Sequence, residues 1–152
     1  MKIFTRRHVL IAAFAALVST GAANGTAAAD SSFEYDCIYI QNATGQTLYM
    51  NANTTKAALA ATITQASPII APNKVGTVCA LAANPNSILL SHQAGYNVGA
   101  ANSKVVATFS MSNWRPFPPT TSFEVPDGYA AGIIETTHDQ YMSTASFLIR
   151  KL

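Results

Sequence analysis

Residues 35–41 read Tyr-Asp-Cys-Ile-Tyr-Ile-Gln, and their side chains alternate between two sets. A repeat of two residues is the period of a β-strand, whose successive side chains point to opposite faces of the sheet. The alternation places Tyr35, Cys37 and Tyr39 on one face and Asp36, Ile38 and Ile40 on the other. Asn42-Ala43-Thr44-Gly45 then predicts a turn, because Asn and Gly tolerate a positive φ.

Similar extended segments follow along the chain and are separated by turn signals about every 8–15 residues, which is typical of an all-β sandwich or barrel. Pro68 and Pro72 bracket Ile69-Ile70 and indicate a short edge segment. We predict one β-sandwich domain of eight or nine strands. The strands after the first are expected at Gln46–Ala52, Val75–Ala82, Ser87–His92, Lys104–Met111, Thr120–Val125, Tyr129–Thr136 and Tyr141–Arg150.

The segments between these strands carry three further expectations. Thr54 or Thr55 could cap a short helix within Asn53–Thr62, the one stretch where Ala and Leu favour helix. Gln93–Ser103 is rich in Gly and Asn, and Asn113–Pro119 is rich in Pro, so both are interpreted as loops. Pro126-Asp127-Gly128 is the strongest hairpin signal in the chain.

The first 29 residues have the pattern of a cleaved export signal. Basic residues precede an uncharged run at Val9–Val18, which is too short to span a bilayer, and Ala27-Ala28-Ala29 offers a cleavage site. An alternative cut lies near Ala23. Arg6-Arg7 resembles a twin-arginine motif, with an ordinary secretory signal as the alternative. We expect the mature domain, residues 30–152, to be periplasmic or secreted.

Removal of this leader changes the charge of the protein. The intact chain has a formal net charge of +2 at pH 7, and Lys2, Arg6 and Arg7 belong to the leader. The mature part is therefore near −1 and has no broad positive field to attract nucleic acid or an anionic membrane. Nucleic-acid binding is excluded on this ground, and no transmembrane segment is expected in the mature part.

Both cysteines, Cys37 and Cys79, lie in the mature part. In an oxidising compartment they are expected to form one disulfide, which closes a loop of about 42 residues. Two separate buried thiols are the alternative. No C-x-x-C redox pair is present.

Motifs with catalytic chemistry are absent from the sequence: no G-x-S-x-G, H-E-x-x-H, P-loop or G-x-G-x-x-G is found. His138 beside Asp139 is expected to be a solvated turn residue rather than a ligand or proton-transfer group. His92 is expected to be a half-buried core residue. Two histidines without a cysteine or acidic cluster do not indicate zinc, so no metal or cofactor is predicted.

A pair of carboxylates could support glycoside hydrolysis. The candidate pairs are Glu34 with Asp36, and Glu124 with Glu135 across the predicted hairpin. Neither pair is distinguished from ordinary surface charge, and a small hydrolase is the least favoured hypothesis. We predict that the protein is not an enzyme.

The most unusual stretch is Ser112–Pro119, which contains the only Trp together with an Arg and a Phe between prolines. Trp and Arg are enriched at binding hot spots, and prolines lower the entropy cost of ordering a loop. We predict a binding surface at Trp114, Arg115 and Phe117, with Tyr96 and Tyr129 nearby. The alternative is that Trp114 and Phe117 plug one end of the sandwich.

Three segments resemble the actinoporin-like and aegerolysin families of small lipid-binding β-sandwich cytolysins. Ile38–Gly45 resembles their first strand, Ile69–Gly76 resembles their Pro-x-Lys-Val segment before a core strand, and Phe109–Trp114 resembles the strand that leads into the aromatic headgroup loop of actinoporins. The chain departs from them in two ways: Asp30–Asp36, at the start of the expected mature part, is too short for a pore-forming helix, and a single Trp stands where their aromatic cluster is far richer. The resemblance implies a β-sandwich that binds a headgroup or glycan rather than an autonomous pore-former.

These observations predict an exported, non-enzymatic module that binds a lipid headgroup, a glycan or a protein partner. The alternative is a secreted protein inhibitor or toxin component, in which the stiff loop fills a partner's cleft.

Overall fold

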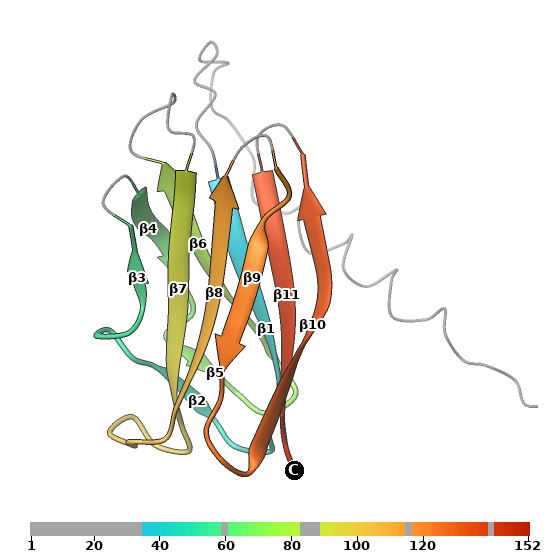
Figure 1. Ribbon diagram of the computed structural model, residues 1–152. Helices are drawn as coiled ribbons and strands as arrows, with labels where there is room; N and C mark the ends of the chain where they lie inside the picture. Colours follow the sequence, from blue (N-terminus) through green and yellow to red (C-terminus); the bar gives the residue numbers. More distant parts are fainter. Residues whose placement is uncertain (1–34, 59–60, 83–88, 115–116, 140–141) are drawn as a thin grey trace, which may run out of the picture. The chain divides into compact units, whose positions relative to one another are not determined.

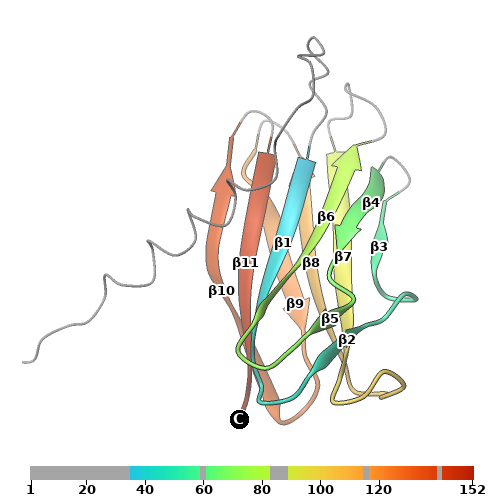
Figure 2. The ribbon, with the colours of Figure 1, turned by 180° about the vertical axis from the view of Figure 1, so that it is seen from behind.

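The computed structural model describes residues 35–58, 61–82, 89–114, 117–139 and 142–152. The expected leader and Arg115 lie outside these residues, and so does Asn84-Pro85-Asn86, for which the sequence predicts a turn. Figure 1 shows two β-sheets stacked face to face, and Figure 2 shows the same layers from behind. The prediction of an all-β sandwich is confirmed.

The first sheet has five strands in the order β10-β11-β1-β6-β4. Its first and last strands along the chain, β1 and β11, are neighbours and run parallel, with Ile38 opposite Ala145. The strand bounds are β1 Tyr35–Ala43, β4 Ala61–Ala66, β6 Val75–Ala82, β10 Tyr129–His138 and β11 Met142–Lys151.

The second sheet has six strands, with β5-β2-β7-β8-β9 in order and β3 paired to β7 beside them. The short β5 at the edge confirms the expectation from Pro68 and Pro72. The strand bounds are β2 Leu48–Met50, β3 Lys56–Ala57, β5 Ile69–Ile70, β7 Leu89–Val98, β8 Val106–Trp114 and β9 Thr120–Glu124.

The core lies between the two sheets and is formed by the inward-facing side chains, which alternate along β1 with outward-facing ones as the sequence predicts. Ile38 and Ile40 of β1 point inward and are fully buried, as are Phe109 of β8 and Phe147 of β11. The rings of Phe109 and Phe147 lie 5.2 Å apart between centroids and so join the two sheets. Burial of these side chains supplies the main stabilisation of the fold.

The predicted disulfide is present between Cys37 and Cys79. The two residues face each other on the adjacent antiparallel strands β1 and β6, with their Cα atoms 4.1 Å apart. Both belong to the outward face of the first sheet, yet each is only 1% exposed. The bond therefore joins two strands of one sheet rather than the two sheets.

The expectation of a short helix at Asn53–Thr62 is wrong. In the described part of this stretch, β3 pairs with β7 and β4 pairs with β6, and Ala58 N donates a 2.8 Å hydrogen bond to Ser91 O. A helix of one or two turns is marginal on its own, so strand pairing prevails over the helix propensity of Ala and Leu.

The prediction of a loop at Gln93–Ser103 is also wrong for the first half of this stretch, because β7 continues to Val98. Ala94, Tyr96 and Val98 alternate into the core and outweigh the Gly and Asn between them. Gly95 is required within the strand, because a Cβ there would collide with the Thr54 side chain. The described chain holds eleven strands, more than predicted.

The turn at Pro126-Asp127-Gly128 exists, with Gly128 at φ 83° and Tyr129 N donating to Pro126 O. The predicted hairpin is wrong, however, because the turn crosses between the sheets. β9 before it pairs with β8, whereas β10 after it pairs with β11. Turn chemistry specifies a change of direction but not the partner of each strand.

Candidate functional site

The outward face of strands β7, β8 and β9 is a grid of polar side chains. Alternation turns Ala107, Phe109, Met111 and Asn113 of β8 into the core, so the residues between them face outward. The strand register aligns them in rows across the sheet. The rows are Ser91–Ser112–Thr120, Gln93–Ser110–Ser122 and Gly95–Thr108–Glu124.

This grid has the regular spacing of the sheet itself. Neighbouring strands lie about 4.8 Å apart, and alternate residues along a strand lie about 7 Å apart. Five of the residues named in these rows are serines or threonines of β8 and β9, whose hydroxyls each donate one hydrogen bond and accept two. Such a face can form many hydrogen bonds to a polar ligand that carries no net charge.

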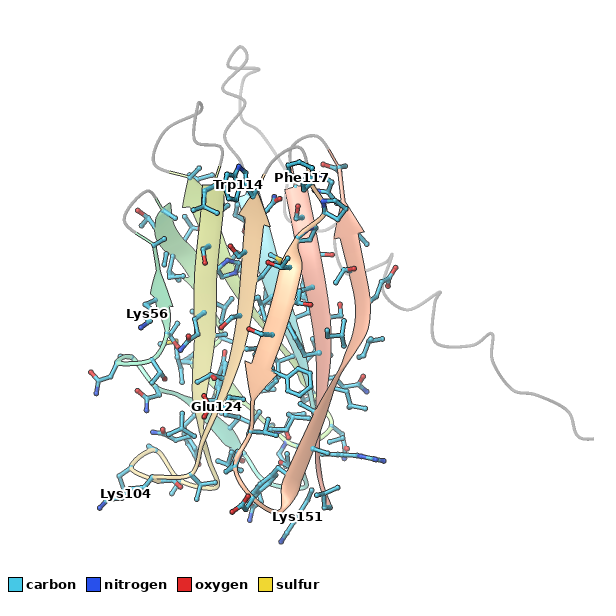
Figure 3. All side chains as sticks on the ribbon, in the orientation of Figure 1. Lys56, Lys104, Trp114, Phe117, Glu124 and Lys151 are labelled. Carbon is cyan, nitrogen blue, oxygen red and sulfur yellow. A yellow bond between two sulfur atoms is a disulfide. The ribbon has the colours of Figure 1, made fainter. Side chains whose placement is uncertain are left out.

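Trp114 stands at one end of the grid. It is the last residue of β8 and lies outward of the sheet opposite Leu89 of β7, so it belongs to a strand rather than to the predicted loop. The indole is 60% exposed. Phe117 is 64% exposed, and its N donates a 2.8 Å hydrogen bond to Trp114 O. Figure 3 shows Trp114 and Phe117 at the same end of the sandwich.

The two tyrosines expected beside Trp114 are elsewhere, and that part of the prediction is wrong. Tyr96 is fully buried, its hydroxyl donates to Ser67 O at 2.9 Å, and burial raises its pKa. It lies seven residues along β7 from Leu89, the partner of Trp114, a distance of about 23 Å along the strand. Tyr129 pairs with Lys151 at the opposite end and donates to Gln46 Oε1.

A depression of about 350 Å³ opens on the same outward face, between β3 and the grid. It is lined by Lys56, Ala57, Ala58, Ser91, Gln93 and Ser110 among others. The Gln93 amide is held in place, because its Nε2 donates to Thr54 O at 3.0 Å and its Oε1 accepts from Ser110 Oγ at 3.4 Å.

Beneath Trp114, a buried polar cluster connects the two sheets. Asn113 Nδ2 donates to Ser143 Oγ at 2.9 Å and approaches Asp36 Oδ1 at 3.4 Å, while Ser143 N donates to the same carboxylate at 3.1 Å. The Ser143 hydroxyl also lies 2.8 Å from Nδ1 of His138, an exposed residue at the end of β10. The cluster fixes the backbone beside Trp114.

This cluster brings Asp, Ser and His together but does not form an accessible nucleophile. Ser143, Asp36 and Asn113 are all fully buried between the sheets. His138 also presents Nδ1 to the serine, so the carboxylate does not orient the imidazole as it does in a hydrolytic triad. The arrangement therefore supports a structural role for Ser143.

His92 points into the core and is almost fully buried, more deeply than the half-buried position that we predicted. Its Nε2 lies 3.3 Å from Val78 O, and burial lowers its pKa to about 4. Among the described residues its Nδ1 has no hydrogen-bond partner. No group of three potential metal ligands occurs in that part of the chain.

The carboxylate pairs considered for glycoside hydrolysis are not supported. Glu124 pairs with Thr108 in one sheet and Glu135 with Ser146 in the other, so no hairpin brings them together. Asp36 lies in the buried cluster, and Glu34 is outside the described residues.

Comparisons with known proteins leave the family open. No protein-family model matches the chain, and no curated protein matches it. Across the described residues, no helix has the length and apolar character needed to cross a membrane.

The grid was missed at the sequence level, although the signal was present. From Thr108 to Trp114 every second residue is polar or exposed, and Thr120, Ser122 and Glu124 repeat the same period. Reading the outward set of each strand, as well as the apolar inward set, would have identified this face.

Proposed function

We propose that this chain is an exported, non-enzymatic module that binds glycans on the outward face of β7, β8 and β9. The observation that carries the proposal is the position of Trp114, an exposed indole at the end of a regular array of hydroxyl groups on one sheet face. The disulfide and the leader pattern support export.

Each part of the face matches a part of a sugar. The C–H groups of a pyranose ring can pack on the electron-rich face of an indole, and Trp supplies this contact with little loss of side-chain entropy. Sugar hydroxyls can donate to and accept from Ser91, Ser112 and Thr108, and can donate to Ser110, whose own hydrogen is directed at Gln93 Oε1. Because the groups belong to paired strands, they are held in place before the ligand binds.

The length of the face fits an oligosaccharide better than a single sugar. Trp114 and Ser110 are four residues apart on β8, which corresponds to about 13 Å along the strand. A chain of sugars along β8 would contact the indole at one end and the depression near Gln93 at the other.

The test is binding to a glycan panel, followed by titration calorimetry with the best oligosaccharide. Trp114→Ala is expected to weaken binding by more than about tenfold, the loss typical of a hot-spot aromatic residue. Phe123→Ala is the matched control, because Phe123 faces the other side of its sheet and contacts Phe147. Unchanged affinity in Trp114→Ala would refute the proposal.

A lipid interface is the second candidate function, and one observation favours it. Leu89, Trp114 and Phe117 are all exposed, and the strand register and the turn hydrogen bond bring them to one end of the sandwich. Trp prefers the membrane interface. Sedimentation with neutral and anionic vesicles separates the two candidates, because a lipid-binding end requires Phe117 and does not require Ser110 or Ser112.

A further inference from the structure

Lys56 gives the depression beside β3 a positive charge, whereas the neighbouring part of the outward face carries none. Lys56 of β3 lines the depression, and its backbone pairs with Gln93 of β7. No carboxylate is among the described residues that line it. The acidic residue of the grid, Glu124, lies on β9, three strand spacings or about 14 Å across the sheet.

Polar groups at the depression, Lys56 included, can donate hydrogen bonds to acceptor atoms of a ligand. Ser91 and Ser110 line the depression together with Lys56 and the small residues Ala57 and Ala58. Within the described part of the chain, neither the Lys56 ammonium nor the Ser91 hydroxyl makes a hydrogen bond to another residue. The Gln93 amide is hydrogen-bonded to Thr54 and Ser110, so its oxygen is not available to accept a hydrogen bond from Lys56.

We propose that the glycan is acidic and that the depression binds its anionic substituent, with Lys56 as the counter-charge and Ser91 as a hydrogen-bond donor. This inference rests on the proposed function. It specifies the ligand class: an oligosaccharide with a carboxylate or sulfate ester, which lies along β8 with the C–H face of one of its sugar rings stacked on Trp114. Charge-assisted hydrogen bonds of this kind are stronger than neutral ones.

The probe is oligogalacturonate, and its methyl ester is the matched ligand, because esterification removes the charge and keeps the sugar chain. The intact mature protein is expected to bind the acid roughly tenfold more tightly than the ester. A sulfated and an unsulfated oligogalactose form a second pair, which distinguishes a sulfate from a carboxylate. The preference for the charged member should shrink as salt rises.

Two variants test whether Lys56 causes the preference for the charged oligosaccharide. Lys56→Gln should bring the affinity for the acid down to that for the ester, and leave the ester unchanged. Lys104→Gln is the control, since Lys104 is an exposed lysine in the loop between β7 and β8, far from Trp114 in Figure 3. It should change neither affinity.

The outcomes separate this inference from the proposed function. If charged and neutral members of both pairs bind equally, or if Lys56→Gln keeps the preference for charge, the acidic-glycan inference is overturned while glycan binding stands. If Trp114→Ala binds every oligosaccharide as well as the parent protein does, the proposed function fails, whatever Lys56 does.

Discussion

Asn113 Nδ2 donates a 2.9 Å hydrogen bond to Ser143 Oγ across the interior of the sandwich. Asn113 belongs to β8 of one sheet and Ser143 to β11 of the other, and both are fully buried. Asn113 immediately precedes Trp114, so this bond fixes the end of the strand that carries the exposed indole.

Asn113→Ala is expected to lower the free energy of unfolding by about 2 kcal/mol, because it removes a buried donor shared by Ser143 and the Asp36 carboxylate. Urea denaturation followed by circular dichroism measures the change. Ser112→Ala is the control, since its side chain lies on the outward face of the same strand, and it should stay within about 0.5 kcal/mol. Equal stabilities for the two variants would show that the cluster contributes nothing.

Stability should also depend on pH through His92. Its pKa is about 4 in the folded protein and near 6.5 when unfolded, so the unfolded chain holds more protons between these values. The free energy of unfolding must then rise with pH. The contribution of His92 is fully present above about pH 6.5, and about 3 kcal/mol of it is lost as the pH falls to about 4.

The measurement is urea denaturation of the parent protein and His92→Gln from about pH 4 to about pH 7. Gln has no titrating group and can still approach Val78 O, the partner of His92. The difference in unfolding free energy between the two proteins should change across this window and level off above it. A constant difference would mean that His92 keeps an ordinary pKa when folded.

Much of the fold was predictable because its signals are local. The alternation at Tyr35–Gln41 gave β1 and its inward face, and the bounds of β6 at Val75–Ala82 were predicted to the residue. The pairing of strands was not predictable in this way, since it depends on contacts between distant residues. The turn before Tyr129 therefore looked like a hairpin although it connects the two sheets.

The candidate site was predictable only in part, for a related reason. Trp114 was identified by its rarity and by the prolines after it, but those prolines concealed that it ends a strand. Tyr96 shows the reverse error, because an aromatic side chain in a Gly- and Asn-rich stretch can equally face the core. Lys56 gave no signal of its own, since its place beside Ser91 arises only from the pairing of β3 with β7.

The disulfide is expected to stabilise the domain without being needed for its topology. Replacing both cysteines by Ala should cost about 4 kcal/mol, since the bond closes a loop of 42 residues in the unfolded chain. The strand spectrum should remain, because Cys37 and Cys79 face each other in a ladder whose other pairs persist. Thermal denaturation with and without reductant measures this, and a parent protein insensitive to reductant would contradict it.

Trp114 gives a direct optical test of exposure, because it is the only Trp. With 60% of its surface exposed, its emission should resemble that of a free indole derivative and be readily quenched by acrylamide. Addition of the bound oligosaccharide should shift the emission to shorter wavelength and protect it from quenching. Blue-shifted, unquenched emission from the free protein would place the indole in the core instead.

Gly95 provides a test of the register between β7 and the segment that leads into β3. A Cβ at this position would collide with the side chain of Thr54, so Gly95→Ala should destabilise the domain by about 1–3 kcal/mol. Thr54→Ala in the same chain should recover only part of this loss, because it removes the Oγ1 nearest to the new methyl group but keeps the Thr54 Cβ, which is also close to it.

Gly132→Ala is the matched control for this pair, since a Cβ there meets nothing within 4 Å and Gly132 also lies within a strand. It should be neutral or slightly stabilising, because Ala restricts the unfolded chain more than Gly does. Urea denaturation of Gly95→Ala, Thr54→Ala, the double variant and the parent protein gives the coupling free energy between the two positions. Additive effects of Gly95→Ala and Thr54→Ala would show that the two residues do not touch, and the register between β7 and the segment before β3 would then differ from the one described.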